Sequence, residues 1–167
     1  MSEKNDYPVK KVSIICAKGA LEDVYAALVM GNGAVMEGIE TNLFFTFFGL
    51  EAIMTKYQDH LHTGTVGNPA MRLPGGARLP TMLGGLPGME SMVSKMMRKG
   101  MDELDIPGVS EFLELIDAGG GKIYACKLAI DMFKVKKEDL NEYVSDIITI
   151  GEFYEKAGGE GSHIIFT

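Results

Sequence analysis

The sequence predicts an α/β domain in which helices cover both faces of a mostly parallel sheet of about five strands. Short β-branched or aromatic runs alternate with segments of helical spacing along the chain. Several of these runs are apolar at successive positions, which is typical of strands buried on both faces. Such alternation favours a doubly wound fold, and 167 residues suit one domain with its own core. We therefore expect a flexible tail over residues 1–8 and a single domain over residues 9–167.

The first half of the chain predicts two strand–helix units. β-branched residues dominate 9–16, and apolar residues with helical spacing follow from 21 to 38, where Gly38 is a natural helix stop. The aromatic run 43–48 predicts a central strand of the sheet. A short helix over 50–56 completes the second unit.

The middle of the chain, residues 58–100, is rich in Gly, Pro and Met and is interpreted as an insertion. Connections this long usually carry function or partner contacts. Met89, Met92, Met96 and Met97 have helical spacing after Pro87. This helix is expected to pack through its flexible thioethers, and the alternative is an adaptable surface for another subunit or a partner.

Regular elements resume in the last third of the chain. Pro107 and Ser110 begin a helix that ends at the glycines 119–121. A short strand follows at 122–125, and Cys126 is its last residue or the first residue of the turn. The later predicted elements are a helix at 128–133, a short helical segment at 136–140, a strand at 147–150, a helix at 151–156 and a strand at 163–166.

Composition argues against several classes of function. A net charge of −7 disfavours a nucleic-acid partner, which would need clustered Lys and Arg. The polar N-terminus is not a signal peptide, and no apolar run approaches the roughly 20 residues of a membrane-spanning helix. We therefore expect a cytoplasmic protein without a membrane span. Its two cysteines are then either buried apolar side chains or reactive thiols.

Both cysteines follow predicted strands, at the sheet edge where α/β folds form their sites. Cys126 lies at the start of a helix, whose dipole favours the thiolate, and Lys122 and Lys127 add positive charge nearby. Because the thiolate is the nucleophile, Cys126 is the residue expected to carry the chemistry. Cys16 ends an apolar run and is equally well explained as part of the core.

The sequence contains no recognisable metal-binding or cofactor-binding motif. His60 and His62 are compatible with metal binding if both lie on one strand face, but no third ligand follows at a typical spacing, which favours a surface loop. No phosphate-binding loop, catalytic Ser-His-Asp order or paired-cysteine zinc spacing is present. We expect no metal and no cofactor.

Five segments, taken in order, are similar to a known family. The segments are 17–25, 45–50, 66–69, 86–89 and 125–132. They resemble the DsrE/DsrF/DsrH-like superfamily of sulfur-relay proteins, in particular its stand-alone subgroup of sulfurtransferases, sometimes labelled a peroxiredoxin family. No thioredoxin-like pair of thiols supports the peroxiredoxin label.

The resemblance implies a flavodoxin-like three-layer fold and assembly into homo-oligomers, commonly trimers or hexamers. It also implies that Cys126 carries sulfur as a persulfide or thiosulfonate and exchanges it with small sulfur-carrier proteins or rhodanese-like donors. Some relatives have a second cysteine two helical turns later, and this chain has none there. From the matching segments, the residues expected to line a pocket are Lys18, Gly19, Tyr25, Gly49, Lys127 and Met132.

Two questions stay open at this point. Cys16 is an auxiliary thiol only if its strand lies next to the strand of Cys126. The alternatives to sulfur transfer are a small-ligand-binding module of the same fold and an oligomeric scaffold that docks a partner through the Met-rich helix.

Overall fold

The computed structural model describes residues 8–64 and 86–167. In them, five strands form one sheet in the order β4-β3-β2-β1-β5, and every neighbouring pair is parallel. The predicted α/β class is confirmed, with a sheet that is parallel throughout. The strands are β1 (Lys11–Cys16), β2 (Glu40–Phe45), β3 (Lys122–Cys126), β4 (Asp146–Ile148) and β5 (Ser162–Phe166).

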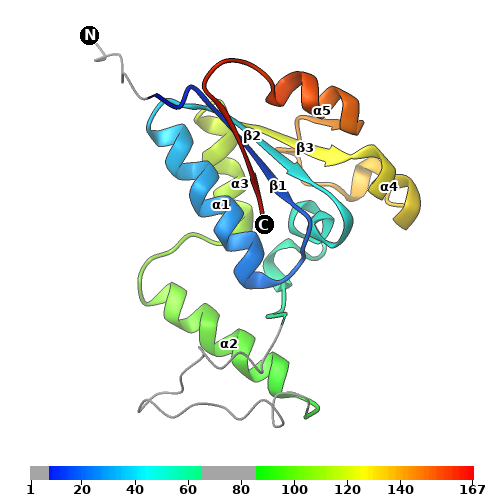
Figure 1. Cartoon of the computed structure of the whole chain (residues 1–167). Coiled ribbons are helices and arrows are strands. Elements are labelled where there is room, and N and C mark those ends of the chain that lie inside the picture. The colour runs from blue at the N-terminus through cyan, green and yellow to red at the C-terminus, as the bar shows by residue number, and fades with distance from the viewer. Residues whose placement is uncertain (1–7, 65–85) are drawn as a thin grey trace.

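Helices cover both faces of this sheet and make a three-layer domain (Figure 1). On one face, Gly31 of the first long helix packs directly against Leu43 of β2. On the other face, the ring of Phe153 stacks on Phe44 of β2 with 4.6 Å between ring centroids. The helices are α1 (Leu21–Met36), α2 (Met89–Asp102), α3 (Val109–Ala118), α4 (Lys127–Phe133) and α5 (Ile150–Ala157), with short 3-10 helices η1 (Phe47–Ile53), η2 (Gln58–His60) and η4 (Lys137–Asp139).

The end of α1 follows directly from the sequence. Gly38 has a positive φ of 71° and donates its N–H to the carbonyl of Val35. Ile39 donates to the carbonyl of Ala34, so the last free carbonyls of the helix are satisfied by the turn. A glycine is the residue that adopts this left-handed conformation without a Cβ clash.

The strand predicted at 43–48 lies earlier in the chain. β2 ends at Phe45, and Phe47 has a positive φ of 44°, which turns the chain into η1. The aromatic run therefore contributes both to a buried strand and to an exposed turn. Its apolar pattern alone does not distinguish these two environments.

Parts of the predicted insertion and tail lie outside the described residues, namely 65–85 and 1–7. The Met-bearing segment forms α2 as predicted, and Figure 1 shows it apart from the sheet. Its buried residues are Val93 and Ser94, whereas Met92 is half exposed, so its methionines carry only part of the packing.

Across residues 8–64 and 86–167, no helix combines the length and apolarity that crossing a bilayer requires.

Candidate functional site

Cys126 ends β3 and is the N-cap residue of α4. Its strand lies between β2 and β4, and its register partner is Ile148. α5 starts at Ile150, two residues after that partner, so two helices begin close to this thiol. Cys126 is 6% exposed, which places it just beneath the surface at the carboxyl edge of the sheet.

Cys16 ends β1 in a more enclosed position. It is 1% exposed, and its thiol donates to the carbonyl of Lys18 at 3.5 Å. Burial raises the pKa of the Cys16 thiol to about 11, because the thiolate would lose its hydration there. A hydrogen bond with Thr167 offsets only part of that effect.

The sheet keeps the two cysteines apart. β2 lies between their strands, and Phe45 pairs with Cys16 on one side and with Ala125 on the other. Cys126 is one residue beyond Ala125, so its side chain belongs to the opposite face of the sheet. Exchange between the two thiols would require β1 and β3 to be adjacent, and in this sheet they are not.

We expect Cys16 to resist alkylation in the folded protein. A pKa raised from 9.0 to about 11 lowers its thiolate fraction about 100-fold near neutral pH. Peptide mapping after iodoacetamide treatment at about pH 8 should show Cys16 labelled about 100-fold more slowly than in urea. Its labelling should accelerate as the pH approaches 11. Equal rates with and without urea would contradict this.

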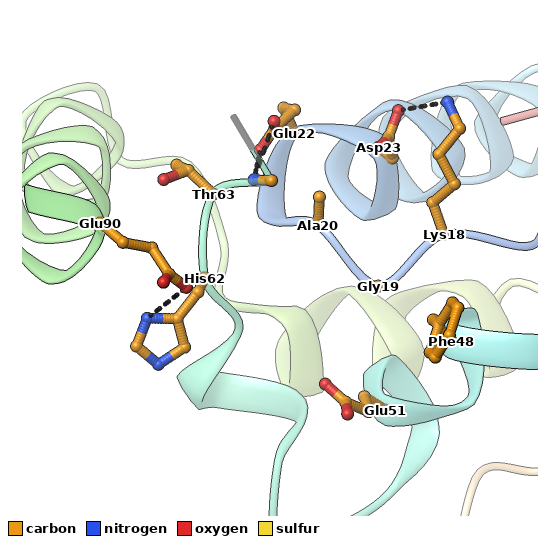
Figure 2. Close-up of a pocket in the computed structure, with 11 residues that line it drawn as sticks. Lys18, Gly19, Ala20, Glu22, Asp23, Phe48, Glu51, His62, Thr63 and Glu90 are labelled. Atoms are coloured by element: carbon orange, nitrogen blue, oxygen red, sulfur yellow. Dashed lines mark hydrogen bonds and ion pairs between the residues drawn. The ribbon is translucent and has the colours of Figure 1, made fainter. Parts of the chain in front are cut away.

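A cavity of about 750 Å³ opens at the carboxyl ends of β1 and β2 (Figure 2). Its floor is the loop after β1, with Gly19 against the backbone of Phe48. Sites in parallel sheets form at this edge, close to where the strand order reverses. The charged residues that line the cavity are Lys18, Glu22, Asp23, Glu51, His62 and Glu90.

Most of these charges have a partner within the cavity wall. The ammonium of Lys18 lies 3.2 Å from Asp23, and His62 lies 3.4 Å from Glu90. Glu22 accepts the backbone N–H of Gly64 at 3.1 Å. Four carboxylates face one lysine and one histidine, so the wall disfavours anions such as thiosulfate or thiosulfonate. Cys126 does not line this cavity.

A smaller, apolar cavity of about 280 Å³ lies between η1 and the end of α4. The rings of Phe48 and Phe133 approach within 5.9 Å across it. Phe47, which lines the cavity, and Lys134, which lies in sequence between the lining residues Phe133 and Val135, both have positive φ. Non-glycine residues rarely adopt this backbone conformation. Phe48 and Glu51 line both this cavity and the acidic cavity.

The structure separates the predicted pocket residues into four groups. Lys18 and Gly19 line the acidic cavity, whereas Tyr25 lines a cavity of about 180 Å³ beside α2 and donates to the carbonyl of Pro107. Gly49 packs against the backbone of Cys16, where it allows two loops to approach closely.

Lys127 and Met132 lie on the exposed side of α4, and none of the three cavities includes them. The ammonium of Lys127 pairs with Asp131 at 2.5 Å instead of pointing toward a cavity.

Sequence reasoning missed Glu51, Thr63 and the Phe48–Phe133 pair, because they meet only through tertiary contacts between distant segments. His60 lies in η2 and His62 follows it, so they do not share a strand face. Within residues 8–64 and 86–167, no group of three potential metal ligands is present.

Comparisons with known proteins agree with this architecture. The model of a family described as DsrE/DsrF/DrsH-like matches residues 8–163. The chain is 32% identical to the sulfur carrier protein DsrE2 of Allochromatium vinosum over 151 residues, which is 89% of this chain and 93% of that protein. It is 24% identical over 134 residues to an uncharacterized protein of Bacillus subtilis, YrkE, covering 78% of this chain and 81% of that one.

Two solved structures have a similar fold. MTH1491, of unknown function, from Methanobacterium thermoautotrophicum superposes with a TM-score of 0.55 at 11% identity, covering 94% of this chain and 98% of that one. The ychN protein of E. coli superposes with a TM-score of 0.53 at 13% identity, covering 95% of this chain and 100% of the other. At such identities, these structures support the fold alone.

Proposed function

Because this chain belongs to the DsrE/DsrF/DrsH-like family, we propose that it is a sulfur-trafficking protein that carries sulfur on Cys126 and passes it to a thiol of a partner protein. The observation that carries the proposal is the 32% identity to a sulfur carrier protein over 89% of the chain. Cys126 is the better carrier of the two thiols, because it is closer to the surface than Cys16 and begins a helix.

The chemistry consists of two thiol exchanges. In the first, the Cys126 thiolate attacks the outer sulfur of a donor persulfide, a new S–S bond forms, and the donor leaves as its thiolate. In the second, a partner thiolate attacks the outer sulfur now on Cys126, and the Cys126 thiolate leaves with the electron pair of the broken bond. Sulfane sulfur moves without net oxidation, so neither step requires a metal or a cofactor.

Two features favour another protein as the partner in sulfur exchange. The large cavity is lined by four carboxylates and does not include Cys126. The separation of Cys16 from Cys126 argues for an acceptor thiol on another protein. A rhodanese-like donor and a small sulfur-carrier acceptor in the cytoplasm, with this chain in a homo-oligomer, complete the proposal.

The experiment is site mapping on the wild-type protein. We expect incubation with polysulfide to add sulfur that intact mass spectrometry detects and that dithiothreitol removes. After iodoacetamide trapping and digestion, the added mass should be on the peptide that contains Cys126. Added sulfur on the Cys16 peptide alone, or no added sulfur, would reject the assignment.

A second candidate function is the binding of a small cationic ligand in the acidic cavity. The observation that favours it is the excess of carboxylates over basic groups in a volume of about 750 Å³ at the usual ligand-binding edge. A protein that takes up no sulfur, yet is stabilised against heat by a polyamine, would support this reading over sulfur transfer. Loss of that stabilisation in Glu51→Gln would locate the ligand in this cavity.

A further inference from the structure

β5 is an edge strand whose outer side has no neighbouring strand among the residues described here (Figure 1). The N–H of Thr167 donates to Ile15 at 2.8 Å, and the carbonyl of Thr167 accepts from Ala17 at 3.1 Å. Backbone groups alternate in direction along a strand, so residues 163 and 165 also face β1. The backbone N–H and carbonyl groups of Ile164 and Phe166 therefore point away from the sheet.

The two edges of the sheet differ in their protection. β4, at the other edge, has three residues and starts with the exposed Asp146. β5 has five residues, and residues 161–167 contain no Asp, Glu, Lys, Arg or Pro. Natural proteins usually shorten or charge an edge strand, or cover it, to prevent pairing with another chain. Among the described residues, only the β4 edge has this protection.

The side chains on β5 extend this edge into an apolar surface. Ile164 is 50% exposed and Phe166 is 66% exposed. Phe166 pairs with Ile15 of β1, and Ile15 pairs on its other side with Phe44 of β2, so all three side chains lie on one face of the sheet. Phe44 stacks on Phe153 of α5, which identifies this face as the one beneath α5. The two exposed apolar side chains of β5 therefore lie on the face that α5 covers, whereas the exposed His163 lies on the opposite face.

α5 presents two more apolar side chains toward β5. Phe153 and Ala157 point into the core, and Lys156, on one flank of the helix, lies over Tyr124 of β3. With 100° between successive residues, the opposite flank contains Ile150 and Tyr154. These residues are 53% and 59% exposed. We define the β5 surface as Ile150, Tyr154, Ile164 and Phe166.

We propose that β5 pairs with β5 of a second copy of this chain, antiparallel and about a two-fold axis. In this arrangement Ile164 faces Ile164 of the other copy, and Ser162 faces Phe166. The outward groups of Ile164 then bond reciprocally, as in a hydrogen-bonded antiparallel pair, and the sheet continues through both copies.

Two features favour a second copy as the occupant. An edge strand is its own complement in antiparallel pairing, and this register sets the small Ser162 against the large Phe166. The chain has a net charge of −7, so two copies repel each other over most of their surfaces. β5 contains no Asp, Glu, Lys or Arg, so the two paired strands set no like-charged side chains against each other.

Cross-linking tests the register. In a Cys126→Ser background, Ile164→Cys should give a disulfide-linked dimer on mild oxidation, since facing residues have Cα atoms about 5.5 Å apart. Ser162→Cys is the matched control, because its two copies would lie about 14 Å apart. Cross-linking of both variants alike, or of neither, would overturn the proposed pairing.

Light scattering of the full chain tests the contact without cross-linking. The wild type should contain two chains or an even multiple. Ile164→Pro should at least halve the mass, because it removes an outward N–H and no bond to β1. Met36→Lys is the control, because Met36 is 77% exposed and lies away from β5, and this variant should keep the wild-type mass.

A wild-type monomer at 100 µM, or an odd number of chains, would overturn the proposal. Circular dichroism checks that each variant is folded.

Discussion

Replacing Cys126 by serine is expected to abolish sulfur loading and to lower transfer to an acceptor thiol at least about 100-fold. Serine keeps the shape of the side chain, but its hydroxyl ionises far too weakly to attack a sulfane sulfur at neutral pH. The measurement is intact mass after exposure to polysulfide or tetrathionate. With tetrathionate, a thiolate takes a thiosulfonate group and releases thiosulfate, so both products can be quantified.

Cys16→Ala is the matched control for this prediction. It removes the other thiol, which is 1% exposed and has its pKa raised to about 11 by burial. Loading should remain within a factor of two of the wild type. If Cys126→Ser loads as fully as the wild type, or if Cys16→Ala loses loading while it stays folded, Cys126 is not the carrier.

Gly49→Ala is expected to destabilise the fold by about 1–3 kcal/mol, toward the upper end of that range. A Cβ at Gly49 would lie 2.2 Å from the carbonyl oxygen of Cys16. That oxygen belongs to a central strand and accepts the N–H of Thr46, so it cannot move without disturbing both β1 and η1. The N–H of Gly49 also donates to Ala17, which ties the two loops together.

Gly33→Ala is the control at a glycine with free space. Gly33 is exposed inside α1, and apart from its chain neighbours and the backbone of its own helix, no atom lies within 4 Å of the position of its Cβ. This substitution should stabilise the protein by about 0.5–1 kcal/mol, because alanine favours the helix. Urea unfolding of both variants measures the difference, and Gly49→Ala with wild-type stability would show that the loops separate easily.

The sequence was sufficient to predict the elements of the fold. Local patterns determine these, so the alternation of strands and helices and the stop at Gly38 could be read directly. The left-handed turn at Phe47 could not be predicted, because an aromatic side chain fits a buried strand equally well. The order of the strands is also set by tertiary packing, and only that order shows β2 between the two cysteines.

The candidate site was predictable in part. The position of Cys126 between a strand and a helix follows from sequence, as does its likeness to a family cysteine. The acidic cavity brings together the loop after β1, η1, the segment after η2 and the first turn of α2. No local pattern connects these four segments, because their contact depends on where α2 docks.

The placement of the two thiols determines how long the proposed cargo would remain on the protein. An internal acceptor would discharge a persulfide soon after loading, whereas Cys16 lies across β2 and on the other face of the sheet. Sulfur on Cys126 then leaves only when an external thiol arrives, so its dwell time depends on the concentration of that partner. The same separation would prevent an intramolecular disulfide from blocking the proposed carrier thiol under oxidising conditions.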